Sequence, residues 1–245
     1  EVSQGHKEHC EKLKIPTSSH CLDCRRIQLM NFRNERTFYS DTCKNCGNRM
    51  ISCFSSNSPF TIWCSECWWS DKFDPLKYGK EFDFNRPFFD QFWELMMTTP
   101  LVNLFIASSE NSDYANYSVG NKNSYMLGAS DYNEDSFYAD NSNYCRDACD
   151  ISFVNKSELI YQSVDLVDCY TCLYCRNLRN CNFCYFCADC IGCTNCIGCV
   201  NLHNKQYCIF NKQYKCQEYA AAMKNFALET FSGVQKFTEE FNKFL

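Results

Sequence analysis

One register of this sequence, counted in steps of three residues, contains no charged and no aromatic side chain across residues 112–202. Small and aliphatic residues fill its first part, and cysteine fills most of it across 169–199, while the other two registers are rich in Asp, Asn, Lys, Arg, Tyr and Phe. A period of three matches neither an α-helix nor a flat β-strand. It predicts a narrow coil with small side chains turned inward, because a thin tube holds only small groups at native packing density.

A second period of twelve residues lies within the first. One inward column reads Ser124, Ser136, Ala148, Ile160, Cys172, Cys184, Cys196 and Cys208. The column beside it is apolar throughout, although it cannot point into the tube: Tyr125, Phe137, Cys149, Tyr161, Leu173, Tyr185, Ile197 and Ile209. We therefore expect a mainly β fold, a β-solenoid with coils of about 12 residues and rungs about 4.8 Å apart.

Three interpretations remain open for the cysteines of the register. They are reduced thiols that fill the core as small apolar groups, disulfides within coils such as Cys169 to Cys175, or ligands of metal along the tube. Continuity favours the first, because Ser, Ala, Val and Ile occupy the same register upstream and bind no metal.

A different cysteine pattern lies nearer the N-terminus. Cys43 and Cys46 form one C-x-x-C pair, Cys64 and Cys67 form another, and 17 residues separate the pairs. Gly47 follows the first pair and suits the positive φ that such turns often need. Two pairs at this spacing predict a zinc ribbon with Zn²⁺ on four thiolates. A closed site of this kind stabilises a fold and leaves no coordination position for catalysis.

Cys21 and Cys24 form a third C-x-x-C pair, and this region of the sequence has no fourth pair that would complete a four-thiolate site with it. His6, His9 and Cys10 are its candidate co-ligands, so this part of the sequence predicts a weaker metal site, with a simple turn as the alternative.

Four arginines lie between this pair and Cys43: Arg25, Arg26, Arg33 and Arg36. They could contact phosphates, which makes nucleic acid a possible partner. The alternative is that they pair with Glu35 and Asp41 or stack on aromatic rings.

We expect four regions: a zinc-ribbon domain (1–80), a helical connector (81–108), the solenoid (109–212) and C-terminal helices (213–245). In the connector, a helix should begin near Pro87 and end before Pro100, and its aromatic residues should pack in a junction between domains. The C-terminal region should form two helices hinged near Ser232 and Gly233, which cap the solenoid. Tyr219, Met223, Phe226 and Leu228 should form the apolar face of the first, and Phe237, Phe241 and Leu245 that of the second.

Several motifs resemble those of uncharacterised zinc-ribbon, cysteine-rich repeat proteins of candidate-phyla (Patescibacteria-type) bacteria. The matching segments are NERTFY (34–39), CKNCG (43–47), CSECWWSDKFDPLKYG (64–79), DFNRPFFDQFWEL (83–95), ENSDYAN (110–116), CVNLHNKQYCIFNKQY (199–214) and SGVQKFTEEFNKFL (232–245). The resemblance implies a zinc ribbon, a cysteine-rich repeat region and a helical segment. Members often carry a further C-x-x-C upstream and a second repeat region downstream, so we expect this chain to be a fragment. The resemblance implies no function.

These features favour a non-catalytic zinc-binding scaffold that associates with a protein partner or with itself. The apolar column from Tyr125 to Ile209 is the expected docking stripe, unless it packs on the chain's own helices. Nucleic-acid binding by the ribbon is the first alternative, although the net charge of −5 disfavours it. Metal storage in the thiol core is the second.

Acidic residues cluster at Asp131, Glu134 and Asp135 without a convergent His or Arg, so we expect no enzyme and no small-molecule substrate. The C-x-x-C pairs and the lack of a long apolar run predict a cytoplasmic protein with no membrane contact.

Overall fold

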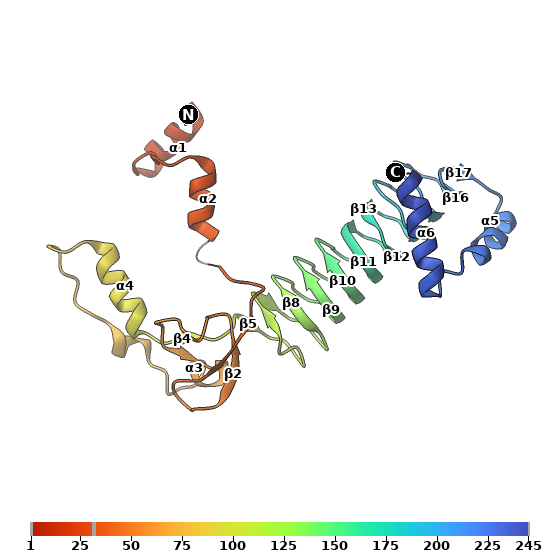
Figure 1. Ribbon diagram of the computed structural model, residues 1–245. Coiled ribbons are helices and arrows are strands. Elements are labelled where there is room, and N and C mark those ends of the chain that lie inside the picture. Colours follow the sequence, from red (N-terminus) through yellow and green to blue (C-terminus); the bar gives the residue numbers. More distant parts are fainter. Residues whose placement is uncertain (1, 31–32, 245) are drawn as a thin grey trace.

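The computed structural model describes residues 2–30 and 33–244, and its largest part is one elongated parallel β-solenoid (Figure 1). Each strand pairs with the strand one coil away at a register of twelve residues, as Ala148 does with Ile160 and Cys184 with Cys196. The strands of this stack are β5 (Ile106–Ala107), β6 (Ala115–Asn116), β7 (Ser118–Val119), β8 (Tyr125–Gly128), β9 (Glu134–Asp140), β10 (Arg146–Ser152), β11 (Glu158–Val167), β12 (Tyr170–Leu173), β13 (Arg176–Arg179), β14 (Asn182–Tyr185), β15 (Thr194–Ile197) and β16 (Gln206–Ile209). The predicted solenoid and its coil length are confirmed.

The inward register must satisfy backbone groups that point into the tube. The Ser112 hydroxyl accepts the N–H of Ser124, one coil later, at 3.1 Å and donates to the carbonyl of Glu110 at 3.0 Å. A cysteine thiol can also donate to such carbonyls, since the Cys175 sulfur lies 3.2 Å from the carbonyl oxygen of Leu173 and 3.3 Å from that of Cys184. Serine and cysteine therefore fill the same register because both are small and both bind the inward-facing carbonyls.

The residue before most inward positions turns a corner of the coil in the left-handed region. Asn123, Asp135 and Asn141 have φ of 48°, 49° and 47°, which suits their short polar side chains. Bulky residues occupy the same corners, among them Tyr144 at 55°. Side chains at these corners point outward, and the rings of Tyr132 and Tyr144 stack 5.1 Å apart along the outside of the tube.

The part of the chain before the solenoid is built from two short β pairs and several helices. The antiparallel hairpin of β1 (Tyr39–Thr42) and β2 (Arg49–Ser52) precedes β3 (Ile62–Trp63), which pairs in parallel with β4 (Leu101–Val102). Helices α1 (Gln4–Leu13) and α2 (Leu22–Met30) stand away from the solenoid in Figure 1. The remaining elements here are α3 (Ser65–Trp68), the 3₁₀ turn η1 (Pro75–Tyr78) and α4 (Phe88–Thr98).

The predicted connector helix exists, but its aromatic residues pack less than predicted. Helix α4 begins after Pro87 and ends two residues before Pro100. Trp93 contacts Phe60, with 5.5 Å between the ring centroids, whereas Phe88 and Phe92 stack on each other 5.7 Å apart and Phe89 is 78% exposed. Figure 1 agrees with this, because α4 projects away from the strands β1–β4 and from the solenoid.

The C-terminal helices α5 (Cys216–Met223) and α6 (Phe231–Phe244), joined by η2 (Lys224–Phe226), pack on the side of the last coils. Phe237 is buried against Ile197 and Ile209 of the apolar column. The predicted hinge is misplaced. The break comes at Ala227, with φ of 46°, while Ser232 and Gly233 lie in the first turn of α6. Leu245, predicted on the apolar face of the second helix, lies outside the described residues.

Strand β17 (Lys212–Gln213) covers the end of the stack by pairing antiparallel with β16. A side chain covers a second part of the same end, because the Asn211 amide binds both the N–H and the carbonyl of Val200, at 2.9 and 2.8 Å. The last coil is therefore closed by the chain itself, as the exposed edge of a parallel stack requires.

Candidate metal centre

The four cysteines of the predicted zinc site lie together. The sulfur atoms of Cys43, Cys46, Cys64 and Cys67 are all within 4.8 Å of one another, and those of Cys46 and Cys64 are 3.9 Å apart. A Zn–S bond of about 2.3 Å places the sulfurs of a tetrahedral site about 3.8 Å apart. The residues therefore fit a four-thiolate zinc ion, and the set leaves no position for water or substrate.

Two tight turns place these thiols on one side. Cys43 follows β1, its N–H donates to the carbonyl of Asn48, and Gly47 closes the turn with φ of 77°. Cys64 precedes α3, and the helix presents Cys67 one turn later. The backbone N–H of Cys64 also donates to the sulfur of Cys43 at 3.2 Å, so the second turn is already oriented toward the first.

The thiols of this cluster differ in acidity. Burial opposes ionisation of Cys43, but backbone N–H groups of Cys46, Cys64 and Asn45 outweigh burial and lower its pKa to about 6. Burial and the neighbouring thiols raise the pKa of Cys64 to about 12. One thiolate is thus stabilised before a metal arrives, and zinc would displace the remaining protons.

The cysteine cluster is joined to the solenoid by the chain that runs through β3 and β4, which pair with each other. Leu101 N–H donates to Thr61 and Asn103 N–H to Trp63, both at 2.9 Å, directly before Cys64. The buried Asn103 side chain donates to the carbonyl of Ile51 at 2.7 Å and accepts from the Ser65 hydroxyl at 2.9 Å. Asn103 therefore ties β2 and α3 to the strand that leads into the first coil. An isolated asparagine gave no signal of this role in the sequence.

We expect Asn103→Leu to lower the free energy of unfolding by about 2 kcal/mol, because it removes the side-chain hydrogen bonds to the partly buried carbonyl of Ile51 and from the Ser65 hydroxyl. Chemical denaturation followed by tryptophan fluorescence measures this. The matched control is Asn57→Leu, at an exposed position, which should change stability by less than about 0.5 kcal/mol. Equal effects of the two substitutions would contradict the role given to Asn103.

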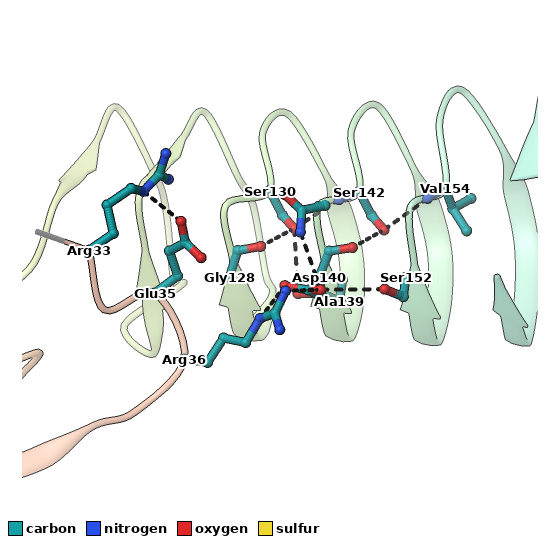
Figure 2. A network of polar contacts seen from close by, with 11 residues as sticks. Arg33, Glu35, Arg36, Gly128, Ser130, Ala139, Asp140, Ser142, Ser152 and Val154 are labelled. Atoms are coloured by element: carbon teal, nitrogen blue, oxygen red, sulfur yellow. Dashed lines mark hydrogen bonds and ion pairs between the residues drawn. The ribbon is translucent and has the colours of Figure 1, made fainter. Parts of the chain in front are cut away.

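A strap formed by residues 33–37 crosses the first coils (Figure 2). Arg36 binds Asp140 with two hydrogen bonds, of 2.7 Å to Oδ1 and 2.5 Å to Oδ2, and Ser152 donates to the same carboxylate. Gly128 lies beneath the strap, and a Cβ there would be in van der Waals contact with Arg36 Cγ, 3.4 Å away. Arg33 pairs with Glu35 at 2.6 Å and lies 4.5 Å from the centre of the Tyr117 ring.

These contacts bear on the predicted arginine cluster. Two of its four members, Arg33 and Arg36, hold the strap on the solenoid, which matches the pairing alternative more than phosphate binding. Asp41 lies near Lys44, at 3.9 Å, instead of an arginine.

The weaker predicted ligands are not brought into a comparable cluster. In the described part of the chain, the group around Cys43 is the one set of three or more ligating side chains that meets the 4.8 Å limit, so His6, Cys10, Cys21 and Cys24 form none. Cys24 N–H does donate to the sulfur of Cys21, 3.4 Å away, as in a turn. The core cysteines form no such set either, and all 22 cysteines are free thiols.

No protein-family model matches this sequence, and neither does any curated protein. The resemblance to bacterial zinc-ribbon repeat proteins therefore stays a prediction. Among the described residues, no helix has the length and apolar character needed to cross a membrane.

Proposed function

We propose that this protein is a non-catalytic, zinc-stabilised scaffold that presents a rigid solenoid to a protein partner or to a second copy of itself. The observation that supports it is the closed set of four thiols next to β3, which is hydrogen-bonded to β4, the strand from which the chain runs directly into the first coil. A zinc ion there would supply folding free energy and hold the first coil in place.

The docking surface of this scaffold is the N-terminal part of the apolar column. Helices α5 and α6 cover the C-terminal part, where Ile197 and Ile209 are buried and Tyr185 packs against them. Tyr125 and Phe137 are 40% and 41% exposed, and the corner residue Tyr138 continues the same patch. Only this uncovered part of the stripe is open to a partner.

We expect Tyr125→Ser combined with Phe137→Ser to weaken association about tenfold or more, because it removes the exposed aromatic surface without touching the core. Sedimentation velocity measures self-association, and affinity capture measures binding of a partner. Tyr132→Ser with Tyr144→Ser is the matched control, since it removes an exposed aromatic pair elsewhere on the tube. Association that survives the first pair of substitutions would contradict this docking surface.

The alternatives have less support. Arg146 lies 3.3 Å from Glu134, contrary to the expectation that no cation meets the acidic cluster, but the pair is exposed and belongs to an ion-pair ladder with Lys122. This arrangement gives no reason to propose an enzyme. Of the predicted arginine cluster, Arg25 and Arg26 would remain for nucleic-acid binding, and among the described residues no group of core cysteines meets the limit for a metal site. The C-x-x-C pairs are the reason to propose a reducing, cytoplasmic location.

A further inference from the structure

Residues 108–114 form one side of the first coil, and the edge of this side that faces the ribbon is bare. The C-terminal end of the solenoid is covered by β17 and by the Asn211 amide. At the N-terminal end, β3 and β4 lie beside the cysteine cluster and pair with each other in a sheet of their own. The side formed by 108–114 has neither kind of cover.

The pairing rule of the solenoid identifies the unused groups on this edge. In a complete rung, the Lys122 N–H donates to the carbonyl of Asn133 at 2.8 Å, and the Lys122 carbonyl accepts from Asp135 N–H at 3.0 Å. The same rule can be applied to the position one coil before Glu110, on the side of the ribbon. A residue there would donate its N–H to the carbonyl of Ser109 and accept the N–H of Asn111 with its own carbonyl.

The described part of the chain places no residue in that position. Among the described residues, neither the Ser109 carbonyl nor the Asn111 N–H has a hydrogen-bond partner, and the same is true of the next such pair, the Ser112 carbonyl and the Tyr114 N–H. Unpaired groups in a row are a template for the addition of a strand.

Space for a strand is available beside this edge. A cleft of about 470 Å³ lies between the first coil and the ribbon. Ser109, Asn111 and Ser112 line it from the coil, and Arg49, Ser65 and Glu66 line it from the ribbon. An extended segment that entered here would become an additional rung, which is the β-augmentation mode of peptide recognition.

The charge that a bound segment needs is indicated by a column of outward-facing residues, one from each coil, that ends at this edge. It reads Glu110, Lys122, Glu134, Arg146 and Glu158, so its charges alternate from coil to coil. Lys122 and Arg146 both lie near Glu134, at 3.9 and 3.3 Å. Glu110 is the terminal member, and the alternation calls for a basic residue above it.

The two positions after Glu110 indicate which backbone conformation and which side-chain size a bound segment needs. Asn111 is a left-handed corner with φ of 48°, and Ser112 is buried in the inward register. A rung above them needs a residue that tolerates the left-handed region, such as Asn or Gly, and then a small residue. The chain itself contains one such pairing: the segment Lys122–Ser124 pairs with the segment Glu134–Ser136 of the next coil. The bare edge, Glu110–Ser112, has the same kind of sequence as Glu134–Ser136: a glutamate, a residue that adopts the left-handed region and an inward serine. A segment like Lys122–Ser124 should therefore fit on it.

We propose that the bare edge at 108–114 binds an extended segment of a partner protein that carries a basic residue, an Asn or Gly, and a small residue in succession. The segment adds one rung to the solenoid between the first coil and the metal centre. The inference rests on the proposed role as an interaction scaffold, but it uses a surface other than the aromatic patch at Tyr125 and Phe137.

The test measures binding of a fluorescein-labelled synthetic peptide with the sequence of residues 121–128 to the zinc-loaded full chain by fluorescence anisotropy. We expect saturable binding, which Glu110→Lys weakens about fivefold to tenfold by replacing attraction with repulsion. A peptide with Lys122→Glu should bind wild type weakly and bind the Glu110→Lys chain better than the unaltered peptide does. Glu158→Lys is the matched control, because it makes the same charge change in the same column far from the cleft and should leave binding unchanged.

Thermal melting of the Glu110→Lys chain shows whether it remains folded, and recovery of binding by the charge-reversed peptide excludes misfolding as the cause of the loss. Absence of saturable binding to about 1 mM, the weak end of measurable affinities, or equal effects of Glu110→Lys and Glu158→Lys, would overturn the proposal. A dimer of the chain that Glu110→Lys dissociates, without peptide binding, would assign the edge to a second copy and also overturn it. Failure here while the Tyr125 and Phe137 patch still mediates association would leave the scaffold function standing.

Discussion

Replacing Cys43 and Cys46 together by serine should abolish zinc binding and unfold the ribbon, while the solenoid keeps its strands. Structural zinc contributes about 10–16 kcal/mol of binding free energy in small zinc domains, which exceeds the stability of most domains. The hairpin β1–β2 is short and has little buried apolar surface of its own. The solenoid, by contrast, is held by its ladder of backbone hydrogen bonds and its buried register.

Hydrogen exchange with mass spectrometry measures this effect region by region. We expect loss of protection across residues 39–68 and at β4, with protection across 145–199 retained. The control is Cys21→Ser with Cys24→Ser, which removes a C-x-x-C pair outside the cluster and should preserve both the zinc content and the protection of 39–68. Protection of the ribbon that persists in the Cys43 and Cys46 variant would show that its fold does not depend on metal.

Cys184→Asp should unfold the cysteine-rich coils, whereas Cys184→Ser should change the free energy of unfolding by only about 1 kcal/mol. Cys184 is fully buried, and its thiol lies 3.5 Å from the carbonyl of Asn182. A carboxylate there would be buried without a cation, at a cost of several kcal/mol, and it would repel the carbonyls around it. A serine hydroxyl can bind the same carbonyls, as Ser136 does in this column by donating to Glu134.

Circular dichroism during thermal unfolding measures both substitutions. The matched control is Asn182→Asp, two residues earlier and exposed, which introduces the same side chain outside the tube and should change little. If Cys184→Asp and Asn182→Asp melted alike, the inward register would be wrong. A large loss of stability in Cys184→Ser would indicate that the thiols have a role beyond filling the core and binding carbonyls.

The solenoid could be predicted from sequence because the same types of side chain are excluded from the same position in every coil. A tube this narrow excludes large and charged side chains from every third position, and positions from Ser124 to Cys196 show that exclusion without an alignment. The corners were harder to predict. Asn123 and Asp135 are typical left-handed residues, but Tyr144 and Phe183 occupy equivalent corners and obscure the pattern.

The cluster of four cysteines could be predicted because they come as local pairs, but its attachment to the solenoid could not. Asn103 joins β2 and α3 to the segment that leads into the first coil through contacts with Ile51 and Ser65, which are distant in sequence and carry no motif. The exposure of the α4 aromatic residues was also missed, since helical spacing shows which side chains share a face and not what covers it. For the same reason, the sequence left open whether Ile197 and Ile209 face a partner or the chain's own helices.

The central claim is that the solenoid core consists of reduced thiols and that the chain holds a single zinc ion, at the N-terminal cysteine cluster. Elemental analysis of the purified protein, combined with titration of its thiols in denaturant and chelator, tests this most directly. We expect one zinc per chain, held by Cys43, Cys46, Cys64 and Cys67, and 22 titratable thiols. Several metal ions per chain would show that the solenoid core binds metal, and a deficit of thiols in pairs would show that the core is crosslinked by disulfides. Either result would contradict a core of reduced thiols with one structural zinc site.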